Sequence, residues 1–182
     1  AESLGEEGAE VATNCKNAIP SVILSIGKEF YNNKDFSNAK AKFVEAAEVA
    51  KKYGNDEVTA EVESLLPTVG KRIALAKVNE AMKNKDIAGV LAGYEEAMAI
   101  DTTDANTALK YGQFLGNAGK YDDAVKYLEL AARHGQEGNA KSVLSTTFLK
   151  NAAAQLKAGK YAEAVKLAET AISYKENAQA YL

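Results

Sequence analysis

The chain of 182 residues has little of several residue types that mark particular classes of protein. Its one cysteine, Cys15, has no partner for an intrachain disulfide and leaves the redox compartment unassigned. One cysteine and one histidine are too few for a zinc site built from these ligands. No apolar run approaches the roughly 20 residues that a membrane-spanning helix requires. These absences exclude a disulfide scaffold, a Cys/His zinc centre and a membrane span.

Proline is also scarce, with only Pro20 and Pro67, so most of the chain is free to form helices. The 22 basic and 25 acidic residues are interleaved and give a net charge of -3. A nucleic-acid-binding surface needs basic residues concentrated on one face, so we expect no nucleic-acid partner. Apolar residues make up 47% of the chain, as in an ordinary globular protein.

The chain begins at Ala1 without an initiator methionine. This start fits a secreted protein whose signal peptide was removed, which would make it extracytoplasmic. It fits equally well a fragment of a longer chain. We therefore expect a soluble protein of unassigned compartment.

One short stretch recurs along the chain. Residues 118–128 read AGKYDDAVKYL, and residues 158–167 repeat this as AGKYAEAVKL. Looser copies occur at 33–36 and 84–87. Each copy is a polar turn followed by one apolar residue, here called the plug, and by an amphipathic pattern of helical period. The plugs are Phe36, Ile87, Tyr121 and Tyr161. Four such corners predict four antiparallel helical hairpins.

A second pattern precedes the first two corners. Apolar residues spaced by three and four predict one buried helix face, and the pattern occurs twice, at Val11, Cys15, Ala18, Val22 and Ile26 and at Val58, Val62, Leu65, Val69 and Ile73. We expect Cys15 to be a small buried residue in this face. The two prolines match between the copies, and each marks either a kink in one long helix or a break between two helices.

Aligned on the plugs, the four corners resemble the tetratricopeptide repeat family. Small residues recur nine positions before and three and ten positions after the plug, for example Gly112, Ala124 and Ala131. The family period of about 34 residues separates the second and third copies. The resemblance implies an all-α, right-handed superhelical solenoid of antiparallel helix hairpins, with about four repeats. The expected segments are a lead-in helix 1–19, repeats 20–53, 71–104, 105–138 and 145–178, a second lead-in 54–70 before repeat two, and the start of a capping helix at 179–182.

No catalytic set emerges from the residue types and spacings. His134 lies in a loop-like context, and the glycines of 116–119 lie between two expected helices, whereas a phosphate-binding loop follows a strand. Many glutamates lie four residues from a lysine, as Glu48 does from Lys52, an arrangement that stabilises exposed helices. We therefore expect no enzyme activity, no catalytic residue, no metal and no cofactor.

The resemblance implies instead a scaffold that binds a protein or peptide segment in a concave, apolar and mildly basic groove. The residues that the family pattern places on this face are Leu24, Lys28, Tyr31, Arg72, Leu75, Asn79, Lys83, Leu109, Gln113, Leu149 and Lys157. A second interpretation of the leucines remains open, namely that they only pack against the return helices. An alternative function also remains open, that of a structural or assembly domain in a larger, cell-envelope protein, with weak self-association.

Overall fold

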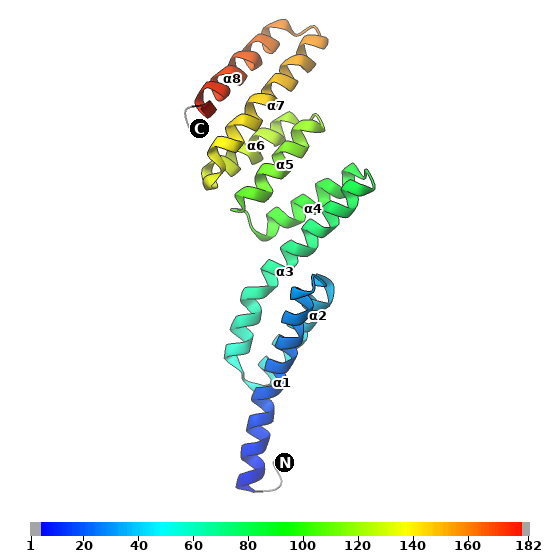
Figure 1. Cartoon of the computed structure of the whole chain (residues 1–182), viewed down its shortest axis with the longest axis vertical. Coiled ribbons are helices and arrows are strands. Elements are labelled where there is room, and N and C mark those ends of the chain that lie inside the picture. The colour runs from blue at the N-terminus through cyan, green and yellow to red at the C-terminus, as the bar shows by residue number, and fades with distance from the viewer. Residues whose placement is uncertain (1–4, 180–182) are drawn as a thin grey trace. The chain divides into compact units, whose positions relative to one another are not determined.

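The computed structural model describes residues 5–179, and every regular element within this range is a helix. The helices follow one another as antiparallel pairs joined by short corners (Figure 1). They form two compact units, of which the first ends at Ile100 and the second begins at Asp101. The prediction of an all-α protein built from helical hairpins is confirmed.

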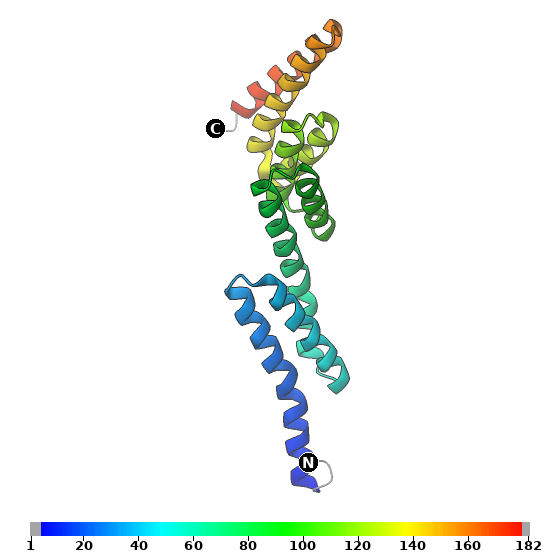
Figure 2. The ribbon, with the colours of Figure 1, turned by 90° about the vertical axis from the view of Figure 1, so that its right-hand side faces the viewer.

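The first unit contains α1 (Glu6–Asn32), α2 (Phe36–Tyr53), α3 (Asp56–Lys83) and α4 (Ile87–Ile100). Helix α1 pairs with α2 and α3 pairs with α4, while α2 also packs along α3 (Figures 1 and 2). Both α1 and α3 continue through their prolines, so Pro20 and Pro67 lie inside single long helices. The core is formed by Phe43, Val62, Val69, Val78 and Val90, each at most 2% exposed.

The second unit contains α5 (Ala105–Asn117), α6 (Tyr121–Ala131), α7 (Glu137–Lys157) and α8 (Tyr161–Gln179). Helix α5 pairs with α6 and α7 pairs with α8, and α7 also contacts both α5 and α6. The hairpins of this unit therefore share one interior, in which Leu115, Leu128 and Leu144 are at most 1% exposed. A single hairpin buries little of its apolar face, so this stacking supplies the core.

The four corners have the same backbone geometry. Two positions before each plug stands a residue with positive φ, and these residues are Lys34, Lys85, Gly119 and Gly159, with φ of 63, 57, 78 and 75°. At each corner the next amide donates to a carbonyl near the end of the preceding helix, as Lys120 N does to Leu115 O at 2.9 Å. This left-handed termination satisfies carbonyls that the helix end leaves unpaired. The four predicted corners are thus confirmed as copies of one turn.

Small residues lie where paired helices cross. Ala39, Ala46, Ala97, Ala124 and Ala131 are all fully buried. Gly27, Gly93 and Gly112 face the partner helix so closely that a Cβ atom there would lie within 2.6 Å of a neighbouring side chain. These residues allow the backbones to approach, which is the role that the repeat pattern predicts for them.

The apolar face predicted for the first lead-in differs from its copy. In α3, Val58, Val62 and Val69 are at most 5% exposed, as expected. In α1, Val11 and Val22 are 54% and 57% exposed, and Cys15 is also exposed. The prediction that Cys15 is buried is therefore wrong. Helix α3 has α2 beside this face, whereas none of the described helices of the first unit covers the corresponding face of α1.

Two helix boundaries also differ from expectation. Residues 134–138 were expected to form a loop, but the non-helical backbone is confined to His134, Gly135 and Gln136, and α7 begins at Glu137. An acidic residue in the first turn stabilises a helix by interacting with the positive end of the helix dipole. Glu137 lies in this turn and forms an ion pair with Lys141 at 2.6 Å. At the other end α8 continues through residues 177–179. The rest of the expected capping segment, residues 180–182, lies outside the described residues.

In the described part of the chain, no helix combines the length and the apolar composition needed to cross a membrane.

Candidate functional site

Four of the expected groove residues line one open hollow in the first unit. Tyr31, from the end of α1, meets Arg72, Leu75 and Asn79 of α3 around a volume of about 460 Å³. Tyr31 belongs to the first hairpin and the other three to the second, so the hollow lies where the two hairpins stack. We call this site the α1–α3 hollow. Its remaining lining residues are Asn32, Lys34, Phe36 and Ala76.

The local sequence explains how these side chains come together. Arg72, Leu75 and Asn79 are spaced by three and four, so they lie along one face of α3. Tyr31 is in the last turn of α1, and the first corner then places Phe36 at the start of α2. The Tyr31 and Phe36 rings meet edge to face, with centroids 5.4 Å apart and planes 62° apart.

The hollow combines an apolar floor with a basic rim. Tyr31, Phe36 and Leu75 are half-buried, whereas Lys34 and Arg72 are exposed. The described residues that line the hollow include these two cations and no carboxylate. A guanidinium beside apolar surface can bind a carboxylate through paired hydrogen bonds. The arrangement suits an apolar side chain that lies next to a negative charge.

Three expected groove residues of the first unit lie elsewhere. Leu24 differs from the prediction because it is only 3% exposed and packs in the hydrophobic core beside Phe43. For this leucine the alternative interpretation, packing against the return helix, describes the structure. Lys28 forms an ion pair with Glu61 of α3 at 2.5 Å. Lys83, in the last turn of α3, is exposed and is not among the residues that line the hollow.

The expected groove residues of the second unit are distributed over different surfaces. Gln113 lines a small hollow of about 260 Å³ beside Thr146 and Lys150. Leu149 is 50% exposed and lines another, larger hollow. Leu109 is half-buried on α5, and Lys157 is exposed at the end of α7.

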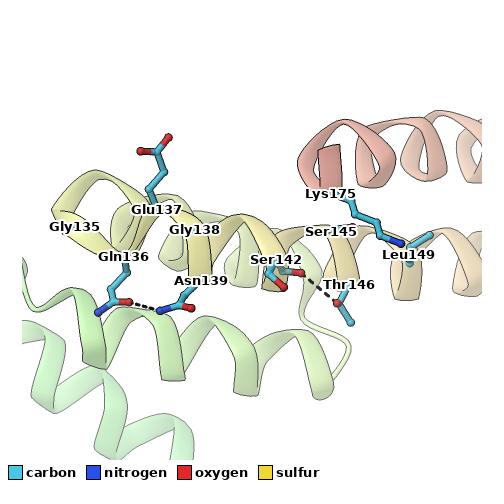
Figure 3. Close-up of a pocket in the computed structure, with 10 residues that line it drawn as sticks. All are labelled: Gly135, Gln136, Glu137, Gly138, Asn139, Ser142, Ser145, Thr146, Leu149 and Lys175. Atoms are coloured by element: carbon cyan, nitrogen blue, oxygen red, sulfur yellow. Dashed lines mark hydrogen bonds between the residues drawn. The ribbon is translucent and has the colours of Figure 1, made fainter. Parts of the chain in front are cut away.

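The larger hollow in the second unit, about 550 Å³, is lined mostly by polar residues and glycines, together with Leu149 (Figure 3). It is lined by the segment from Gly135 to Asn139, by the first turns of α7 and by Lys175 of α8. Gln136 accepts a hydrogen bond from Asn139 at 2.8 Å, and Lys175 extends toward Leu149 (Figure 3). This hollow was not predicted from the sequence, in which its visible signal is a polar segment flanked by Gly135 and Gly138.

Sequence reasoning also missed four residues of the α1–α3 hollow. Lys34 and Asn32 were assigned to a corner, Phe36 to the interior as a plug, and Ala76 to no role. Their position in the sequence could have indicated this role for the corner residues, because each corner directly follows the end of the forward helix whose residues were expected to face the groove. Phe36 serves both purposes, since it is half-buried and also lines the hollow.

The two tyrosines with shifted pKa values, Tyr94 and Tyr174, do not line the α1–α3 hollow. Burial raises the pKa of the Tyr94 phenol in the core of the first unit. Burial also raises the pKa of Tyr174, with Glu129 raising it further and Lys141 lowering it. Within residues 5–179 no group of three or more histidine, cysteine, aspartate or glutamate side chains is placed to hold a metal ion.

Comparisons with known proteins find similar solved structures only. No family model and no curated protein sequence matches the chain. Several solved structures are similar to it. Two crystal structures of MamA have 17% and 16% identity, with TM-scores of 0.42 and 0.39. They cover 86% and 89% of this chain and 98% and 94% of their own.

A third similar structure is that of YrrB, which is described as a TPR protein with an unusual peptide-binding site. It has 15% identity and a TM-score of 0.37, and the match covers 93% of this chain and 92% of YrrB. Four corners of one geometry recur within the chain, and glycines lie at three of the crossings between paired helices. The chain has an all-α fold of repeated antiparallel helical hairpins.

Proposed function

We propose that this protein is a non-catalytic scaffold that binds a short segment of a protein partner in the α1–α3 hollow. The observation that carries the proposal is the lining of the hollow, where half-buried Tyr31, Phe36 and Leu75 adjoin the exposed cations Lys34 and Arg72. Apolar anchors with a few oriented polar groups are the usual composition of a recognition site. Binding is the general role that helical repeats of this kind perform.

The chemistry of the hollow defines the expected ligand. Leu75 and the two aromatic rings would contact one or two apolar side chains of the ligand. Arg72 would pair with a carboxylate, either an acidic side chain or a chain terminus. Asn79, two turns beyond Arg72 on α3, offers both a donor and an acceptor for the ligand backbone. The ligand is therefore an extended or helical segment that carries apolar residues next to negative charge.

Selection from a random peptide library on the immobilised protein tests this proposal. We expect enriched peptides to carry an acidic residue within a few positions of leucine, isoleucine or an aromatic residue. Titration calorimetry with the best peptide then measures the effect of Arg72→Glu, which should weaken binding by about tenfold or more because a charge-assisted hydrogen bond becomes a repulsion.

Two further variants make the test decisive. Leu75→Asp should weaken binding as well, because it places a charge on the apolar floor. Ile87→Asp is the matched control, since Ile87 is 59% exposed and does not line the hollow. Circular dichroism checks that each variant remains helical. If the selected peptides bind Arg72→Glu and wild type equally, or none is enriched, the hollow is not the binding site.

A further inference from the structure

Helix α1 carries an apolar stripe that faces away from its own hairpin. Val11, Cys15, Ala18, Val22 and Ile26 lie on one face at helical spacing, and all five are exposed. At 100° per residue this face is roughly opposite Pro20, Leu24 and Gly27, which are buried. Helix α1 thus has two apolar faces, although α2 covers only one of them.

Helix α3 shows how the protein uses the same stripe when a neighbour is present. Its copy of the stripe, Val58, Val62, Leu65 and Val69, joins one hydrophobic cluster with Ala46 and Ala50 of α2. Its opposite face pairs with α4, where Val78 meets Gly93. A forward helix of this protein is therefore shaped to lie between two return helices. The outer stripe of α1 fits a return helix that is not part of its own unit.

The chain contains a return helix, α8, that has exposed apolar residues on one face. Counted from the plugs Phe36 and Tyr161, residue Ala47 of α2 corresponds to Ile172 of α8. Ala47 packs against the α2–α3 cluster, whereas Ile172 is 55% exposed. Val165, two turns earlier on the same face of α8, is 57% exposed.

The sizes of the residues on the two exposed faces are complementary. At the centre of its stripe α3 has Val62 and Leu65, and the small Ala47 of α2 packs against the same cluster. At the matching positions α1 has the smaller Cys15 and Ala18. The larger Ile172 of α8 would therefore find the space that Val62 and Leu65 occupy in the α2–α3 contact. The smaller side chains on α1 are thus compensated by the larger side chain on α8, which keeps the packed volume of the contact similar, as close packing requires.

The charges are complementary as well. In the α2–α3 contact, Lys51 of α2 pairs with Glu63 of α3 at 3.5 Å. The residue of α8 that corresponds to Lys51 is Glu176, and the residue of α1 that corresponds to Glu63 is Lys16. Docking α8 on α1 in the α2–α3 register would place these two side chains opposite each other with the signs exchanged.

We propose that the outer stripe of α1 binds α8 of a second copy of this chain, in the register of the internal α2–α3 contact. The two surfaces differ, so each chain that joins through one of them still offers the other. Such contacts are heterologous, so they generate closed rings or open chains as the concentration rises. These surfaces share no lining residue with the α1–α3 hollow, so self-association and ligand binding can be tested separately.

Light scattering on size-exclusion fractions of the full chain tests the proposal. Wild type should shift from monomer to dimer and larger species between low micromolar and near-millimolar concentration. Val22→Asp and Ile172→Asp should each weaken association by about tenfold or more, because each buries a charge in the contact. An equimolar mixture of these two variants retains one intact pair of surfaces, so it should form a heterodimer and nothing larger.

Charge reversal provides a second, independent arm. Lys16→Glu and Glu176→Lys should each weaken association, and the double variant should restore it. Val44→Asp is the matched control, because Val44 is a 40% exposed valine on α2 outside both surfaces. Circular dichroism and thermal unfolding confirm that each variant is folded. A monomeric wild type, an unchanged Val22→Asp, or a mixture that stays monomeric would each overturn the proposal.

Discussion

Gly112→Ala should destabilise the second unit even though alanine is the better helix former. A Cβ atom at Gly112 of α5 would lie 2.6 Å from Leu128 Cγ, 2.9 Å from Leu128 Cδ2 and 3.1 Å from the Ala124 carbonyl oxygen. Leu128 and Ala124 are fully buried on α6. Neither the leucine nor the backbone can move aside without disturbing the α5–α6 crossing.

The magnitude follows from two opposing terms. Overpacking a well-filled core costs about 1–3 kcal/mol, and the contact with a backbone oxygen places this site at the upper end. Replacing glycine by alanine inside a helix returns about 1 kcal/mol. We therefore expect Gly112→Ala to lower the free energy of unfolding by about 2 kcal/mol, which is a large fraction of the stability of a small domain.

Gly138→Ala in α7 is the matched control, because no atom lies within 4 Å of the position of its added Cβ. At Gly138 only the higher helix propensity of alanine matters, so this variant should raise the free energy of unfolding by about 0.5–1 kcal/mol. Urea unfolding followed by circular dichroism measures both values. A Gly112→Ala protein as stable as wild type would refute the close α5–α6 approach and the repeat register built on it.

Two further predictions concern the corners and the pH dependence of stability. Lys85→Gly should raise the free energy of unfolding by up to about 1 kcal/mol, and Gly119→Lys should lower it by a similar amount, because both positions have positive φ; equal urea midpoints for all three proteins would contradict this geometry. Burial raises the pKa of Tyr94 above its ordinary 10.0, so its stabilising contribution is complete below that pH and is lost as the pH rises through the raised pKa. Tyr94→Phe should therefore lose less stability than wild type between about pH 9 and pH 12.

The sequence alone was sufficient to predict the local structure of the corners. A polar turn before an apolar plug predicted each one, and the structure has one left-handed residue two positions before every plug. Such a turn depends on a few neighbouring residues, so its pattern is visible without knowledge of the rest of the fold. The small residues at the helix crossings were also predictable, because only they permit the close approach that the repeat requires.

Within the candidate site, the sequence could predict which residues share a face but not which faces remain exposed. Leu24 and Leu75 occupy the same position relative to their plugs, yet Leu24 is in the core and Leu75 lines the α1–α3 hollow. The helical spacing is identical in the two cases. The difference comes from the helices that surround each leucine, and the sequence of a single helix does not show which helices will pack around it.

The stripes of α1 and α3 show the same division between local pattern and tertiary packing. Their spacing predicted an amphipathic face in both helices, and both helices have one. Val62 is buried because α2 lies beside it, whereas Val22 remains 57% exposed because none of the described helices of its unit covers it. The sequence determined that each stripe forms on one face of a helix, since periodicity is a property of the helix itself. Only the tertiary structure decided which stripe is buried, since burial depends on a neighbouring helix that is distant in the chain.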